Sequence, residues 1–145
     1  MRAFLRRHRR IALDTNIYIY QLEANPSYVS LTDEVFDWLE QGNHAAVTST
    51  ITLTELLAPA YRSHEEAQVN EFYALLTTYP NLDWIAPELE IADLAANIRS
   101  KHRLRTPDAI QAATAIERQA TGLVTNDPVF ERVEGFETIL LDRLL

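Results

Sequence analysis

The chain has 145 residues, 47% of them hydrophobic, and a net charge of −8, so we expect one domain over residues 1–145 with little room for a second. It contains no cysteine, which excludes disulfides, thiolate zinc sites and cysteine nucleophiles and leaves oxygen and histidine as metal ligands. No apolar run reaches the about 18 residues of a membrane span, so we expect a cytoplasmic protein without a membrane partner.

The charges are distributed unevenly along the chain. Residues 1–10 contain five arginines and no acid, so the remaining 135 residues carry 8 basic against 21 acidic groups. Such acidity usually serves solubility, and it argues at first against a nucleic-acid partner, because phosphate-binding domains usually carry a basic face. Clustered carboxylates can also form a divalent-cation site, in which the bound metal supplies the positive charge that meets phosphate.

The first half of the chain alternates apolar runs with helical patterns. In chain order we predict a strand over 10–14, a helix over 17–23, a helix over 33–40, a strand over 45–49, a helix over 51–57 and a helix over 65–78. Asn25 and Pro26 break the first helix. Thr32 is the expected N-cap of the second helix, which stops at Gly42. Pro59 is expected to kink or end the third helix.

The second half continues this alternation. Its predicted elements are a strand over 82–85, an amphipathic helix from about Pro87 to about His102 with Leu89 on its apolar face, an alanine-rich helix ending near Gly122, a strand over 123–127 and a strand over 138–141. Thr106 is the expected N-cap of the alanine-rich helix and Pro107 its first helical residue. Alternating strands and helices predict an α/β fold with a central parallel sheet and helices on both faces.

Four acidic residues are expected to meet at one edge of this sheet, because ligands of open parallel sheets collect beyond the carboxyl ends of the strands. Asp14 and Asp127 end apolar strands at that edge. Asp108 lies in the first turn of a helix, where its carboxylate can face the adjoining crevice. Glu55 joins them if the helix that follows Ser49 starts at the same edge.

Four carboxylates in one crevice repel one another, and without a cation some of them would have to bind protons. Hard oxygen ligands with room for water suit Mg²⁺ or Mn²⁺. The chemistry this predicts is metal-assisted hydrolysis: one cation lowers the pKa of a bound water, and a second, if there is one, stabilises the leaving oxygen of a phosphodiester.

The order and spacing of these acids resemble the four acidic motifs of PIN-domain nucleases. The similarity runs from Ile11 to Leu141 and rests on four segments, Asp14-Thr15-Asn16, Thr54-Glu55-Leu56-Leu57, Pro107-Asp108-Ala109 with Ala112-Ala113-Thr114-Ala115, and Thr125-Asn126-Asp127-Pro128-Val129-Phe130. Within the family the chain looks most like a VapC toxin.

The resemblance implies a three-layer α/β/α sandwich and a ribonuclease that depends on Mg²⁺ or Mn²⁺. It implies that the four acids, Asp14, Glu55, Asp108 and Asp127, are catalytic metal ligands, directly or through water. It also implies that Asn16 and Thr125 orient them by hydrogen bonds. VapC toxins cut RNA at restricted sites, are typically dimeric, and are held inactive by a VapB antitoxin whose tail lies over an apolar groove, so we expect a homodimer and a VapB-like partner.

Two features depart from the family pattern. VapC-like chains usually begin almost at the first strand, whereas this one has an arginine-rich lead over residues 1–10. The lead could be an RNA-contacting arm, the result of an early start codon, or an edge segment. Pro128 follows the last acid, where a polar residue is common, and neither departure touches the four carboxylates.

Other residues have both an ordinary and a functional interpretation. Lys101, Arg103 and Arg105 precede Asp108 and could hold RNA phosphate, although a solvated helix end explains them equally well. The four histidines show no metal-ligand spacing, and we expect all of them to be solvated: His8, His44, His64 and His102. A surplus of apolar residues over 17–22 and 53–61 suggests a docking groove.

Two other classes of function compete with the nuclease. A HAD-like phosphatase would use Asp14 as a nucleophile and needs a second Asp two positions later, where this chain has Asn16. A phosphate-accepting receiver needs a lysine late in the sheet, and the chain has none after Asp108. The remaining alternative is a catalytically silent PIN-like module that only binds RNA or protein.

Overall fold

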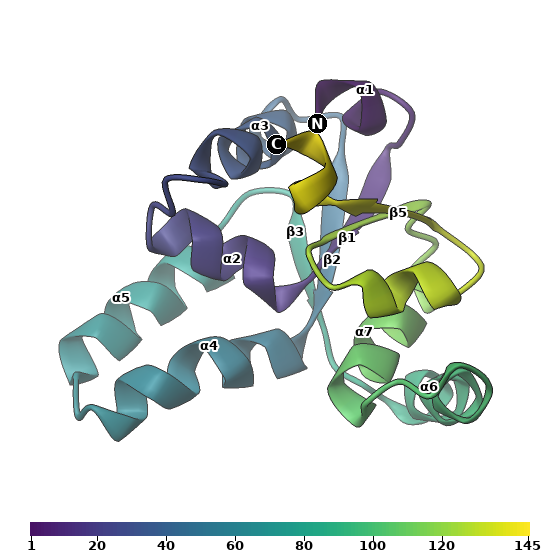
Figure 1. Cartoon of the computed structure of the whole chain (residues 1–145). Helices are drawn as coiled ribbons and strands as arrows, with labels where there is room; N and C mark the ends of the chain where they lie inside the picture. Colours follow the sequence, from purple (N-terminus) through teal and green to yellow (C-terminus); the bar gives the residue numbers. More distant parts are fainter.

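The computed structural model describes residues 1–145 and contains one sheet of five parallel strands in the order β3-β2-β1-β4-β5. The strands are β1 (Arg10–Leu13), β2 (Ala45–Ser49), β3 (Leu82–Ile85), β4 (Gly122–Thr125) and β5 (Glu137–Leu140). The helices are α1 (Arg2–Leu5), α2 (Thr15–Leu22), α3 (Val29–Glu40), α4 (Thr50–Arg62), α5 (Glu66–Thr77), α6 (Leu89–His102) and α7 (Thr106–Glu117), with 3-10 turns η1 (Pro128–Arg132) and η2 (Leu141–Leu144). The predicted fold class, an α/β/α sandwich with a central parallel sheet, is confirmed (Figure 1).

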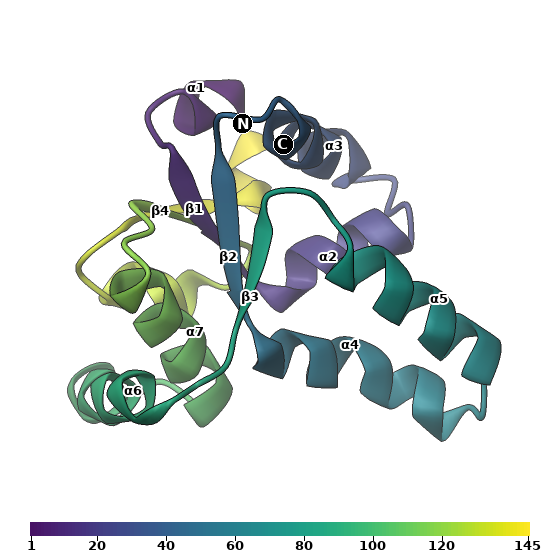
Figure 2. The same ribbon diagram turned by 180° about the vertical axis from the view of Figure 1, so that it is seen from behind.

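The sheet lies between two apolar layers, and successive side chains of a strand belong to opposite layers. On β1, Ile11 and Leu13 belong to the layer formed with helices α1 to α5, whereas Ala12 belongs to the layer formed with α6 and α7. This is the two-residue period of a strand that is buried on both faces. Figures 1 and 2 show α2 and α3 on one side of the sheet and α6 and α7 on the other.

The strand order reverses at β1, because β2 and β3 are added on one side of it and β4 and β5 on the other. The carboxyl ends of β1 and β4 therefore lie side by side at a switch point, where open parallel sheets leave a crevice. The backbone N–H of Asp14, just after β1, donates to the carbonyl of Val124 on β4 over 3.1 Å. The fold thus brings the first and last acidic motifs to the same edge.

Two predicted helix caps were wrong. Thr32 lies buried inside α3, which begins three residues earlier, and its hydroxyl donates to the carbonyl of Val29 over 3.1 Å and to the side chain of Gln21. A threonine hydroxyl satisfies such a backward bond within a helix as readily as it caps one. Arg105, and not Thr106, is the N-cap residue of α7, so Thr106 is already helical.

Several predicted element ends were also displaced. Helix α4 continues through Pro59 to Arg62, α7 ends at Glu117 well before Gly122, and β4 ends at Thr125, so that Asp127 lies in the following loop. Helix α6 begins two residues after Pro87, and its first residue, Leu89, is 84% exposed instead of packed on the apolar face. None of the helices is both long and apolar enough to span a membrane.

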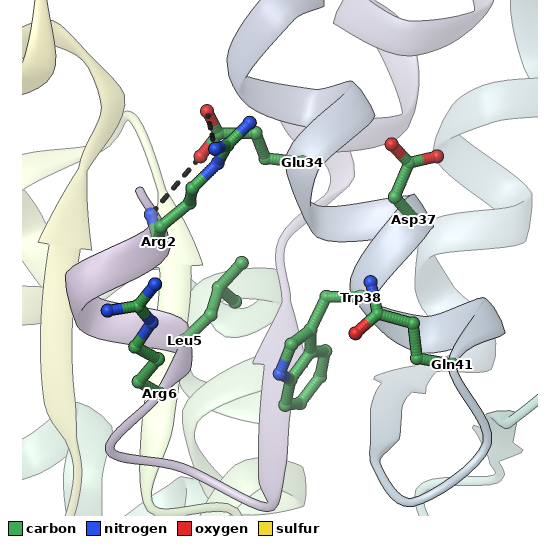
Figure 3. A pocket seen from close by; sticks show the side chains of 7 residues that line it. All are labelled: Arg2, Leu5, Arg6, Glu34, Asp37, Trp38 and Gln41. Carbon is green, nitrogen blue, oxygen red and sulfur yellow. Dashed lines mark hydrogen bonds and ion pairs between the residues drawn. The ribbon is translucent and has the colours of Figure 1, made fainter.

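The arginine-rich lead packs on the body of the protein. Phe4 and Leu5 of α1 are buried in the core. The backbone N–H of Arg2 donates to Glu34 on α3 over 3.1 Å, and its guanidinium lies 3.4 Å from the same carboxylate. Figure 3 shows this pair at a cavity of about 320 Å³ between α1 and α3. Trp38 also lines the cavity.

The prediction of a solvated His8 was wrong. This side chain is buried, with Nδ1 2.8 Å from the hydroxyl of Thr121 and Nε2 3.1 Å from the carboxylate of Glu137, which also pairs with Arg7. Glycine is needed at position 122, beneath the lead, because a Cβ there would clash with Cζ of Phe4 at 2.6 Å. The partners of His8 come from the far end of the chain, so its sequence neighbours could not reveal them.

Candidate active site

Asp14 is one of the two buried acids of the four motifs, together with Asp108. It follows β1 and is the N-cap of α2, and its Oδ1 accepts the backbone N–H of Thr15 over 2.8 Å. Its Oδ2 accepts the hydroxyl of Thr125 over 2.6 Å and the amide Nδ2 of Asn16 over 3.0 Å. Asn16 and Thr125 therefore fix the orientation of this carboxylate from two different elements.

The environment of Asp14 favours its protonated form. Burial raises the pKa of Asp14 to about 6, against the opposing effect of the hydrogen bonds from Thr125 and Thr15. The negative charges of Asp108 and Glu55 contribute to the same shift. The acids of these two motifs are therefore near enough to influence Asp14.

Glu55 reaches the site from α4, whose N-terminus follows β2 directly. It is exposed, and the hydroxyl of Thr15 donates to its carboxylate. Thr15 also lies 3.1 Å from the hydroxyl of Thr52, one turn before Glu55. The first and second acidic motifs are therefore linked by adjacent hydroxyl groups.

A buried polar network lies beneath this link, and the sequence analysis did not identify it. Gln111 of α7 donates through Nε2 to the hydroxyl of Thr52 over 2.6 Å and accepts the backbone N–H of Ser49 through Oε1 over 2.9 Å. The hydroxyl of Thr48 lies 3.1 Å from that of Thr52 and donates to the carbonyl of Leu13 over 3.0 Å. A glutamine among the alanines of α7 was the one signal of it in the sequence.

Asp108 lies in the first turn of α7 and is nearly buried. The guanidinium of Arg105 binds both of its oxygens, with Nε 3.0 Å from Oδ2 and Nη2 3.4 Å from Oδ1. The Arg105 side chain is itself 77% exposed. A cation from the same chain therefore neutralises this acid at the mouth of the crevice.

Asp127 caps the η1 turn after β4. Its Oδ1 accepts the backbone N–H of Val129 over 2.9 Å, and its own N–H donates to the hydroxyl of Thr125 over 3.0 Å. Thr125 thus donates to Asp14 and accepts from Asp127, which holds the ends of β1 and η1 together.

The residues fit a hard divalent cation by their chemistry. All four acids offer oxygen donors, and Oδ1 of Asn16 is a buried acceptor without a hydrogen-bond partner. No group of three acidic or histidine side chains is already arranged to hold an ion. In this structure Asp108 binds Arg105, and Glu55 accepts the hydroxyl of Thr15.

The other basic residues considered as RNA contacts lie at the end of α6. Lys101 is exposed in its last turn. Arg103 is the C-cap in a left-handed conformation with φ of 57°. Neither makes an ion pair with an acid, whereas Arg105 does.

A partly apolar groove with a volume of about 610 Å³ lies between α2, α4 and α5. Its apolar wall contains Ile19, Leu22, Leu56 and Phe72. Its acidic residues are Glu23, Glu55 and Glu65, so one wall is shared with the candidate site. Of the apolar surplus noted in the sequence, Ile17 and Tyr18 are instead fully buried in the core.

The chain belongs to the PIN domain family, since the profile of that family matches residues 11–135. The predicted resemblance of the chain to the PIN-domain family is confirmed by this match. No curated protein matches the chain in sequence.

Solved structures place the fold close to the VapBC type. A chain of VapBC-1 from nontypeable Haemophilus influenzae is similar, with 27% identity, a TM-score of 0.69 and coverage of 92% of this chain and 98% of that one. A chain of a toxin-antitoxin complex from Klebsiella pneumoniae gives 23% identity, a TM-score of 0.69 and coverage of 90% and 97%. A chain of VapBC2 from Rickettsia felis, bound to a DNA fragment from its promoter, has 21% identity and a TM-score of 0.69, with coverage of 90% of this chain and 98% of that one. The predicted likeness to VapC toxins is thereby confirmed.

Proposed function

We propose that this protein is a metal-dependent endoribonuclease and the toxin of a type II toxin–antitoxin pair. The observation that carries the proposal is the convergence of acidic motifs at the carboxyl edge of the sheet, where Asp14 and Asp127 share Thr125 as a hydrogen-bond partner and Thr15, next to Asp14, donates to Glu55. Membership of the PIN domain family and the similarity to VapBC structures support it.

Each acidic motif has a proposed role. Asp14, Glu55, Asp108 and Asp127 hold one or two Mg²⁺ or Mn²⁺ ions, directly or through water. When bound, the metal supplies an activated water and neutralises charge on the phosphodiester. Asn16 and Thr125 keep the Asp14 carboxylate oriented by the hydrogen bonds that they donate to its Oδ2. These bonds favour the ionised form of Asp14, which is the form that binds a cation.

RNA reaches the acidic crevice from the end of α6 in this proposal. The positive charge comes from three residues just before Asp108, namely Lys101, Arg103 and Arg105. Residues 11–145 are otherwise acidic overall. Contacts of this kind position the phosphate backbone and carry no base specificity.

The groove between α2, α4 and α5 is the proposed docking site of a VapB-like antitoxin. Its apolar wall suits an amphipathic segment, and its three glutamates suit a basic residue on that segment. Because Glu55 belongs to both the groove and the crevice, a segment bound there would also obstruct catalysis. The homodimer stays a prediction from the family resemblance, and the cytoplasmic location stays a prediction from the sequence.

The test compares wild type with Asp14→Asn in cells and in solution. We expect toxicity and a defined set of cleaved RNA ends with wild type only, and cleavage by the purified protein that requires Mg²⁺ or Mn²⁺ and stops with a chelator. Purified protein that cuts no RNA, together with an unchanged cellular effect of Asp14→Asn, would establish the silent binding module instead. Phosphate trapped covalently on Asp14 would favour the phosphatase alternative.

A further inference from the structure

Asp108 is a metal ligand in the proposed reaction, but in this structure its carboxylate is bound by Arg105. Both oxygens of Asp108 face nitrogens of the guanidinium, at 3.0 Å and 3.4 Å. Each oxygen keeps a second lone pair, but the guanidinium charge beside it repels a divalent cation. Metal ligation by Asp108 is therefore favoured when Arg105 moves away.

Of the three basic residues just before Asp108, Arg105 is the one that pairs with an acid. Its guanidinium contacts Asp108 through two nitrogens, whereas Lys101 and Arg103 make no ion pair. It therefore places a positive charge where the proposed divalent cation would lie. Unlike an arginine in a buried ion pair, Arg105 has most of its side chain in solvent.

The exposure of Arg105 makes the contact easy to break. Its side chain is 77% exposed, and ion pairs exposed in this way contribute little to stability. It follows Leu104, which is buried at the end of the connection from α6, so the backbone is anchored while the side chain can rotate into solvent. The arginine can leave Asp108 without any rearrangement of the helices.

We propose that Arg105 is an internal counter-cation that competes with the divalent metal for Asp108 and is displaced when the metal binds. This inference rests on the proposed function, because it assumes a metal at the acidic crevice. The displaced guanidinium remains beside the crevice, where it can contact the RNA phosphate. Arg105 therefore has opposite effects on the two steps, weakening metal binding and favouring RNA binding.

The test measures Mn²⁺ binding by calorimetry without RNA, at low salt and neutral pH. Arg105→Gln is expected to bind Mn²⁺ about three- to tenfold more tightly than wild type, because both the ion pair and a repulsive positive charge are removed. The difference should shrink as salt rises. Arg105→Lys keeps the charge and loses the two-point contact, so its affinity should lie between the two.

Arg62→Gln is the matched control, because it removes the same charge from an exposed arginine at the far end of α4. Its Mn²⁺ affinity should equal that of wild type. Cleavage of a short RNA at saturating Mn²⁺ should become slower in Arg105→Gln and stay unchanged in Arg62→Gln. Thermal melting without metal verifies that each variant is folded.

The outcomes separate this inference from the proposed function. Equal or weaker Mn²⁺ binding by Arg105→Gln, or equal tightening in Arg62→Gln, would overturn the competition while leaving the metal site intact. Absence of Mn²⁺ uptake in both wild type and Arg105→Gln would overturn the metal-dependent function and the inference with it. Uptake by Arg105→Gln alone would support the inference in its strongest form.

Discussion

At the scale of single residues, the site depends on carboxylates whose surroundings differ. Asp14 is buried and receives three hydrogen bonds, Asp108 is covered by an arginine, and Glu55 is exposed. At Asp14, burial makes the ionised form costly, which raises the pKa of this carboxyl.

Asp14 should make the metal-free protein less stable as pH rises. Its folded pKa of about 6 lies above the ordinary value of 3.8, so the folded state binds the proton more tightly than the unfolded chain. Stability is then lost as pH rises from about 4 to about 6, by up to about 3 kcal/mol at 1.36 kcal/mol for each pKa unit. Urea unfolding in a chelator at pH 4 and pH 7 measures this.

Asp14→Asn is the comparison for this experiment, because it removes the titrating group. The free energy of unfolding of the variant, relative to wild type, should increase between pH 4 and pH 7. A difference that does not change with pH would contradict the proposed environment of Asp14.

Asp108→Asn should abolish RNA cleavage with little effect on the metal-free fold. Repulsion between like charges in the crevice is removed, which stabilises the fold, but the ion pair with Arg105 is also lost. The two effects oppose each other, so we expect a change of less than about 1 kcal/mol in urea unfolding. A loss of several kcal/mol would mean that the Arg105 contact is a main support of α7.

At the scale of secondary-structure elements, a polar network joins the ends of β1 and β2 to α2, α4 and α7. Its members Thr48, Thr52 and Gln111 are buried, so each hydroxyl or amide group needs a partner within the protein. The network holds the first turn of α4 against the end of β2 through Thr52. Glu55 lies one turn further along that helix.

Thr52→Val should weaken both the fold and the site. The substitution removes the acceptor of the 2.6 Å bond from Gln111 and leaves a buried amide group without its main partner. The expected loss is about 1–3 kcal/mol in urea unfolding, together with slower RNA cleavage at saturating Mn²⁺. Thr54→Val, on the exposed side of the same helix, is the control and should change neither quantity. Equal effects of the two variants would argue against the network.

The elements also show which features a single sequence can predict. The strands were found because buried strands are continuous apolar runs, and Asp14 and Asp127 were selected because they follow such runs. Glu55 and Asp108 were selected because they lie near the start of the next helix. Helix starts at Val29 and Thr106 were missed, because Thr32 bonds backward into its own helix and the cap of α7 has no side-chain bond. The pairs Arg105–Asp108 and Thr52–Gln111 depend on which rotamers and helix faces meet, which no local pattern reveals.

At the scale of the whole molecule, opposite charges gather at opposite ends of β1. The arginine-rich lead precedes the strand, and the acidic crevice follows it. The lead is tied to distant parts of the fold, since Phe4 and Leu5 lie in the core and His8 contacts Thr121 and Glu137. The apolar side chains of the lead therefore have a structural role. Contact between its arginines and RNA requires a separate test.

Phe4→Ala tests whether the lead supports the fold and not the chemistry. Phe4 is fully buried, stacks near His8 with ring centroids 4.4 Å apart and covers Gly122, so its loss should destabilise the protein by about 3–5 kcal/mol. RNA cleavage per folded molecule, measured below the melting transition, should be unchanged. Arg6→Gln, which alters an exposed arginine of the same segment, should leave stability unchanged. If Arg6→Gln instead weakens RNA binding with a smaller dependence on salt, the lead also acts as an RNA-contacting arm, because each lost phosphate contact lowers that dependence.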